Sequence, residues 1–175
     1  MKNTNIFLIS MFPLVLQISP LMADPAADYE RGLKAFRQDD LIGAMNSLEA
    51  AAKTGHADAQ VLLGYILDKA EDNKAAVQWY RRAAENGNAV GAYRLASMYA
   101  AGDGFPRDYE EALRWYRQSA AADYGPALEV LAGAYMEGRL GLPADRQKGL
   151  ELLRQAAAKG YEPARLRLEA QNNKP

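Results

Sequence analysis

Small and apolar residues recur along this chain at the spacing of one face of a helix. In residues 109–122 they are Ala112, Trp115, Tyr116, Ser119 and Ala120. In residues 90–100 they are Gly91, Leu95, Met98 and Tyr99. Both sets follow the i, i+3 or i+4, i+7, i+8 spacing of residues that share a helix face. A Gly-rich segment separates the two stretches, so we predict two helices that pack against each other through these faces.

This two-helix unit recurs at a period of roughly 35 residues, which is typical of helical repeat proteins. The slot of Trp115 is filled in the other copies by Ser47, Trp79 and Leu152. Three residues earlier stands a small residue, as a close helix crossing requires: Ala44, Ala76, Ala112 or Gly149. Seven residues before the anchor stands Asp40, Asp72, Asp108 or Asp145. Eight residues after it, where a helix should end, stands Gly55, Gly87, Asp123 or Gly160. The next first helix then carries Leu63, Leu95, Leu131 or Leu168.

The recurrence predicts an all-α fold, an α-solenoid of about four antiparallel helix pairs followed by a C-terminal half repeat. The predicted pairs are 24–38 with 41–53, 57–67 with 73–86, 90–100 with 109–122, and 126–136 with 146–159, and the half repeat is 163–170. We expect the repeat domain to cover 24–171 and residues 172–175 to form a disordered tail. Apolar Phe105 and Leu142, in the two long turns, are expected to fold back onto their helix pairs.

The repeated residues resemble the Sel-one-like repeat, a branch of the tetratricopeptide-repeat superfamily. Its pattern reads roughly A-x-x-x-L-G-x-x-Y-x-x-G-x-G-x-x-x-D-x-x-x-A-x-x-W-Y-x-x-A-A-x-x-G. In the best copy, Gly102 and Gly104 match the glycine turn, and Trp115 and Tyr116 match the aromatic pair. The resemblance covers residues 57–160 well; the copy from Ala57 lacks the glycine turn, and the last full copy has leucines in place of Trp-Tyr. It implies a helical scaffold with an adaptor role in an envelope or signalling complex.

The first 23 residues have the pattern of a secretory signal peptide. A polar lead with Lys2 precedes an apolar run over 6–18, and the small Ala23 stands before Asp24. The alternative is an uncleaved membrane anchor, but the run is shorter than the roughly 20 apolar residues that a spanning helix needs. We therefore predict cleavage after Ala23, a periplasmic or secreted protein, and no stable membrane insertion after cleavage.

Charge and composition argue against nucleic-acid binding, metal binding and catalysis. The formal net charge is −1 with basic and acidic residues interspersed, so no nucleic-acid binding is expected. The chain has no cysteine and one histidine, His56, which makes a poor metal site, and we expect neither metal nor cofactor. No Ser/His/Asp set and no H-E-x-x-H motif occurs, so an enzyme is not predicted.

Three features have a chemical and a structural interpretation, and in each case we favour the structural one. The four aspartates could act as acid/base groups, but they precede second helices and suit N-caps, and Glu111 would complete a capping box with Asp108. The two Trp-Tyr pairs could stack a ligand, but they lie on the packing faces. The Gly-Asp-Gly segment after residue 101 joins helix to helix, unlike a phosphate loop, and is predicted to be a turn.

The first helices should line the concave side of the superhelix with residues that lie half a turn away from the core leucines. These are Tyr29, Leu33, Phe36, Val61, Tyr65, Asp68, Tyr93, Ser97, Ala100, Glu129, Gly133 and Met136. We expect the aromatic and Met side chains among them to have no core to fill and to face solvent. Exposed aromatic residues on a rigid concave array suit protein recognition.

The sequence therefore predicts an exported, non-catalytic scaffold that binds a protein or peptide partner on this concave face. The binding residues would be Tyr29, Phe36, Val61, Tyr65, Asp68, Tyr93, Ser97, Glu129 and Met136. The alternative is an envelope hydrolase or cell-wall-modifying factor with an active site not visible in the sequence. Catalytic residues are not predicted.

Overall fold

A computed structural model describes residues 24–172 and contains helices but no strand in that range. The helices are α1 (Pro25–Arg37), α2 (Leu41–Lys53), α3 (Ala57–Lys69), α4 (Asn73–Glu85), α5 (Ala89–Ala101), α6 (Tyr109–Ala121), α7 (Gly125–Glu137), α8 (Arg146–Ala158) and α9 (Glu162–Asn172). The predicted signal peptide and the last three residues lie outside the described range. Within it, no helix is long and apolar enough to cross a membrane.

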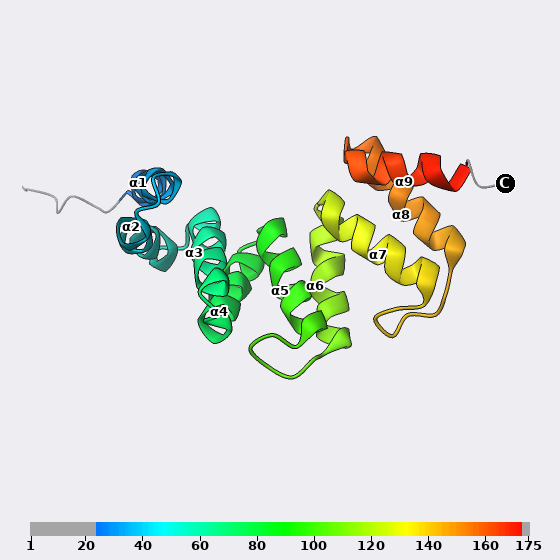
Figure 1. Cartoon of the computed structure of the whole chain (residues 1–175), viewed down its shortest axis with the longest axis horizontal. Coiled ribbons are helices and arrows are strands. Elements are labelled where there is room, and N and C mark those ends of the chain that lie inside the picture. Colours follow the sequence, from blue (N-terminus) through cyan, green and yellow to red (C-terminus); the bar gives the residue numbers. More distant parts are fainter. Residues whose placement is uncertain (1–23, 173–175) are drawn as a thin grey trace, which may run out of the picture.

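The predicted solenoid is confirmed. Helices α1–α8 pack as four consecutive pairs, each pair packs against the next, and α9 packs against α8 as a half repeat. Figure 1 shows the pairs following one another along the long axis, with the two long loops, α5–α6 and α7–α8, at the same edge. Neighbouring first helices also touch, α1 with α3 and α3 with α5. The chain thus presents one surface made of first helices and another made of second helices.

The repeated aspartates cap the second helices, as predicted. Asp40, Asp72 and Asp145 each accept one backbone N–H, and Asp108 accepts two, from Glu110 and Glu111 at 3.0 Å each. The capping box is wrong, however. The N–H of Asp108 donates to the carbonyl of Tyr99, while the Glu111 carboxylate accepts from Arg114 and from the Trp115 indole. Binding two side-chain donors replaces the single backbone bond that a capping box would give.

His56 has the structural role of a helix cap. Its Nδ1 accepts the N–H of Ala59 at the start of α3, as Asn88 does for Gly91 at the start of α5. Its ring also stacks on Tyr29, with the centroids 4.6 Å apart. In the described residues, no group of three or more His, Cys, Asp or Glu side chains could hold a metal ion.

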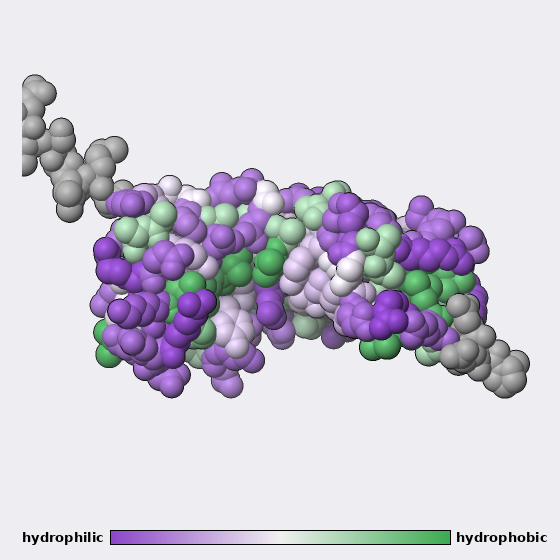
Figure 2. Space-filling model, turned by 90° about the horizontal axis from the view of Figure 1, so that it is seen from above, coloured by the Kyte–Doolittle hydropathy of each residue, from purple (hydrophilic) through white to green (hydrophobic). Residues whose placement is uncertain are grey.

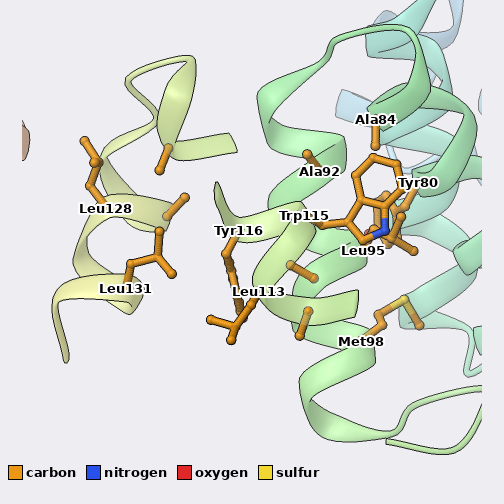
Figure 3. Packing of buried hydrophobic residues seen from close by; sticks show 14 of the residues in the cluster. Tyr80, Ala84, Ala92, Leu95, Met98, Leu113, Trp115, Tyr116, Leu128 and Leu131 are labelled. Atoms are coloured by element: carbon orange, nitrogen blue, oxygen red, sulfur yellow. The ribbon is translucent and has the colours of Figure 1, made fainter. Parts of the chain in front are cut away.

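Small residues let the paired helices approach closely. A Cβ added to Gly149 on α8 would lie 2.3 Å from the Met136 Cγ and 2.7 Å from the Ala132 carbonyl oxygen on α7. Trp115 is 3% exposed and belongs to a central cluster with Tyr80, Leu95 and Leu128, shown in Figure 3. A smaller cluster lies at the N-terminal end and consists of Ala44, Leu48, Ala51, Ala52, Ala59, Leu63 and Ile66.

The long turns fold back onto the solenoid as predicted. Phe105 and Leu142 both pack against the central cluster, and the Phe105 ring lies 4.3 Å from that of Tyr99 between centroids. Gly102 ends α5 with φ of 86°, a left-handed conformation that glycine adopts without a steric penalty. The Gly-Asp-Gly segment is therefore a helix-ending turn.

Candidate protein-binding surface

The nine residues predicted to bind a partner lie on α1, α3, α5 and α7, and all nine are half-buried. The expectation that their large side chains have no core to fill is wrong. Val61, Tyr93 and Met136 pack against the central cluster, and Tyr29 and Phe36 pack against the N-terminal one. Their partners lie on neighbouring helices: the Phe36 ring meets that of Tyr65 on α3, and Met136 lies beside Gly149 on α8. The surface is therefore formed by residues that also contribute to packing.

Tyr65 on α3 stands between two cavities on this surface. One, of about 250 Å³, is lined by Tyr29, Leu33, Asp58, Val61, Leu62, Tyr65, Val90 and Arg94. The other, of about 370 Å³, is lined by Phe36, Leu41, Met45, Tyr65, Ile66, Lys69 and Ala70. The rings of Phe36 and Tyr65 meet edge to face, with centroids 6.2 Å apart. The structure thus brings together four predicted residues, Tyr29, Phe36, Val61 and Tyr65, around two adjoining hollows.

Two cations accompany the Tyr65 ring. The Lys69 Nζ lies 5.7 Å from the ring centroid and the Arg94 Cζ lies 5.8 Å from it, both at the distance of a cation–π contact. Within residues 24–172 neither cation takes part in an ion pair. The carboxylate of Asp58 already accepts a hydrogen bond from Asn88 at 2.8 Å. An anionic group arriving at Tyr65 would therefore meet two available positive charges.

In the middle of the surface, Tyr93 and Ser97 make more contacts within the protein than predicted. Tyr93 makes edge contacts with Tyr116 and Tyr124, with centroids 5.8 Å and 5.4 Å apart. Ser97 Oγ lies 3.1 Å from the Tyr116 hydroxyl, so the two share a hydrogen bond. Ser97 and Tyr116 also line the largest of these hollows, of about 630 Å³, together with the α7–α8 loop.

At the C-terminal end the predicted residues are engaged within the chain. Glu129 accepts a hydrogen bond from the Tyr161 hydroxyl at 3.0 Å and faces the Arg167 guanidinium at 3.8 Å. Burial and this hydrogen bond raise the pKa of Tyr161 to about 12. Arg167 also pairs with Glu137, and Met136 fills the space beside Gly149. Glu129 and Met136 are consequently less available to a partner than the residues around Tyr65.

Tyr80 on α4, from the first Trp-Tyr pair, lies on the packing face as predicted, but its hydroxyl was not considered in the sequence analysis. It is fully buried, and its hydroxyl has no hydrogen-bond partner in the described part of the chain. Burial raises the pKa of this hydroxyl, and the carboxylate of Asp68 adds to the effect. In the next pair the equivalent hydroxyl, on Tyr116, has Ser97 as its partner, but the slot of Ser97 is filled by Tyr65 in this pair. The second pair therefore has an aromatic ring in the slot where the third pair has a serine that hydrogen-bonds to a buried tyrosine.

Apolar side chains on α2 were also missed. Leu41 is 51% exposed and Ile42 is 77% exposed, and Leu41 and Met45 line the hollow beside Phe36. Figure 2 shows apolar residues reaching the surface in patches between polar ones on the face seen from above. The spacing of Leu41 and Ile42 did not indicate this exposure, because the repeat pattern was read from the packing face of the helix.

Comparison with known proteins now identifies the class. The Sel1 repeat family model matches residues 57–88, 89–124 and 126–161, more than half of the chain. The chain belongs to the Sel1-repeat family and is a Sel1-repeat scaffold. The matched segments coincide with the second, third and fourth helix pairs and confirm the resemblance seen in the sequence.

Among solved structures, the chain is similar to a Sel1 repeat protein from Oxalobacter formigenes, with 27% identity, a TM-score of 0.73, and coverage of 81% of this chain and 59% of that one. It is also similar to c5321, a protective antigen of uropathogenic Escherichia coli strains with an SLR fold, with 26% identity, a TM-score of 0.72, and coverage of 81% and 32%. These similarities confirm the solenoid.

Among curated proteins, the chain is 36% identical over 90 residues to DAP3-binding cell death enhancer 1 of Rattus norvegicus, which covers 50% of this chain and 18% of that protein. It is 32% identical over 125 residues to an F-box protein of Arabidopsis thaliana, covering 71% of this chain and 35% of that protein. The chain thus spans well under half the length of the curated relatives it matches.

Proposed function

We propose that this protein is an adaptor that binds a protein or peptide partner on the surface of its first helices, centred on Tyr65. The observation that carries the proposal is the pair of hollows on either side of that ring, with Lys69 and Arg94 beside it. Aromatic anchors that stand beside pockets are typical hot spots of protein interfaces. Sel1-repeat proteins are generally non-catalytic scaffolds, and the name of one relative, DAP3-binding cell death enhancer 1, describes binding to another protein.

The proposal is tested by capturing a partner from the native host and titrating it against variants of the purified protein. Tyr65→Ala should weaken binding by about 2 kcal/mol, close to thirtyfold in affinity. Tyr93→Ala should weaken it too, but Tyr93 packs on two other tyrosines, so this variant should also lose stability. Arg154→Ala, at an exposed position on α8, serves as the control on the second-helix surface. Loss of affinity in Arg154→Ala, with both tyrosine variants binding like wild type, would move the interface to the second helices.

We propose further that the chain is exported and that residues 1–23 are removed as a signal peptide, which would place the adaptor in the periplasm or outside the cell. Support comes from the polar lead, the short apolar run and the small Ala23 that precedes Asp24. Mass spectrometry of the protein isolated from its native host should find an N-terminus near Asp24. Recovery of the chain with Met1 intact in the membrane fraction would refute export.

A further inference from the structure

A cavity on the opposite surface, formed by second helices, occupies the place where the preceding pair holds a tryptophan. It measures about 350 Å³ and is lined by Arg117, Ala120, Ala121, Leu128, Leu131, Tyr135, Lys148, Leu152 and Gln155. Leu152 fills the slot that Trp115 fills one repeat earlier. The cavity therefore results from a change of residue at one repeat position.

The rest of the cavity wall supports this equivalence. Ala120, Leu128 and Leu131 line the cavity. The residues in the same slots one repeat earlier are Ala84, Ala92 and Leu95. Figure 3 shows these three residues in the cluster that holds the Trp115 ring. Leu128 is larger than Ala92, the residue in the same slot one repeat earlier, so it fills part of the space. The cavity remains because the side chain of Leu152 is much smaller than that of Trp115. The site thus keeps the surroundings of an aromatic side chain without the side chain itself.

The rim of the cavity differs from its counterpart in charge. In the third pair, Glu111 accepts the Trp115 indole N–H at 3.0 Å, and the Arg114 guanidinium covers the ring with its Cζ 4.1 Å from the centroid. In the fourth pair those two slots hold Lys148 and Glu151. Lys148 and Arg117 line the cavity, and neither takes part in an ion pair within residues 24–172. Glu151 does not line the cavity, so the charged side chains of the cavity lining are both basic.

We propose that this cavity binds an aromatic side chain, an indole or phenyl ring, presented by an acidic segment of a partner protein. The ring would take the place that Trp115 takes one repeat earlier and bury its faces against Leu128, Leu131 and Leu152. The ammonium of Lys148 and the guanidinium of Arg117 would attract the ring faces and the neighbouring carboxylates. The site is separate from the surface around Tyr65 and does not depend on the function proposed for that surface.

The test uses a short synthetic peptide with one tryptophan between acidic residues, titrated by calorimetry into the whole protein. Leu152→Trp places a tryptophan in the cavity, as Trp115 does in the third pair. The filled cavity should lower the affinity for the peptide at least tenfold, while the thermal midpoint of the protein is retained or raised. A peptide with Ala in place of Trp should bind at least tenfold more weakly than the tryptophan peptide.

Two surface variants keep the test independent of any repacking caused by Leu152→Trp. Lys148→Glu reverses the charge of the rim and should weaken the acidic peptide severalfold, whereas Arg154→Glu, an exposed position on the same helix, should leave its affinity unchanged. Tyr65→Ala should also leave it unchanged, since that residue lies on the other surface.

Failure of the tryptophan peptide to bind at millimolar concentration would overturn the proposal. So would equal binding of the alanine peptide, or binding unaffected by Leu152→Trp. If the protein formed dimers in sedimentation that Leu152→Trp abolished, the occupant would be a second copy of this chain and the assignment to a partner would be wrong.

Discussion

The second and third helix pairs differ in the burial and hydrogen bonding of the residues that occupy equivalent repeat positions. In the third pair Trp115 is buried beneath Arg114, and the Tyr116 hydroxyl meets Ser97. In the second pair the equivalent Trp79 is only half-buried, and the Tyr80 hydroxyl has no partner because Tyr65 replaces the serine. The third pair thus satisfies its buried groups, whereas the second leaves one unsatisfied and places an aromatic ring at the surface.

This difference suggests how a repeat protein separates stability from recognition. Each pair packs mainly against its neighbours, so one pair can lose internal interactions while the adjoining pairs hold it in place. Residues that leave a buried group unsatisfied, with no compensating contact inside the protein, are expected at functional sites. On this view the third pair stabilises the solenoid, and the second pair provides the binding surface.

The largest difference between the pairs should appear when their tryptophans are removed. Trp115→Ala should destabilise the protein by about 3 to 5 kcal/mol, the usual cost of truncating a buried tryptophan. Trp79→Ala should cost less, on the order of 1 to 2 kcal/mol, because part of its ring is already in water. Urea unfolding of both variants measures this. A loss below about 1 kcal/mol for Trp115→Ala would mean that it does not anchor the core.

A smaller difference is expected at the helix caps. Asp108→Ala should cost about 0.5 to 2 kcal/mol, the range found for N-caps, because Asp108 accepts two backbone N–H groups. Asp72→Ala should fall at the lower end, since Asp72 accepts only the N–H of Ala75 at 3.2 Å. Thermal unfolding of the two variants gives the comparison. Loss of partner binding in Asp108→Ala at unchanged stability would show that this aspartate has a role other than capping.

The two buried tyrosines should respond differently to loss of the hydroxyl. Tyr116→Phe removes the hydrogen bond with Ser97 and should cost about 0.5 to 1.5 kcal/mol. It also leaves the Ser97 hydroxyl without that partner, which adds to the loss. Chemical denaturation with a matched Ser97→Ala variant would show whether the two changes are coupled. Additive losses in the double variant would contradict a bond between them.

Tyr80→Phe should have the smallest effect and the opposite sign. It removes a buried hydroxyl that has no partner, so stability should stay the same or rise by up to about 1 kcal/mol. The measurement is the midpoint of urea unfolding relative to wild type. A loss comparable with that of Tyr116→Phe would mean that the Tyr80 hydroxyl does make a stabilising interaction.

The repeat register was enough to predict the solenoid, its helix pairs and the aspartate caps, because those depend on residues that recur in every copy. Several features of the site depend on contacts between copies. That Tyr93 packs on Tyr116 and Tyr124 depends on two neighbouring helices. The cavity at Leu152 depends on the sizes of side chains from α6, α7 and α8 together. Spacing along one helix carries no information about such neighbours.

The proposed binding surface is centred on Tyr65, and the most informative change is Tyr65→Ser, which introduces the third pair's residue into the second. The new hydroxyl would occupy the slot from which Ser97 reaches Tyr116, and so could pair with the Tyr80 hydroxyl. This offsets part of the packing lost with the ring.

Titration of the captured partner into Tyr65→Ser, alongside thermal unfolding of the free variant, is the decisive measurement. We expect an affinity loss of about thirtyfold, the cost of losing a 2 kcal/mol hot spot, with a thermal midpoint close to that of wild type. Wild-type affinity in the folded variant would contradict a binding surface centred on Tyr65.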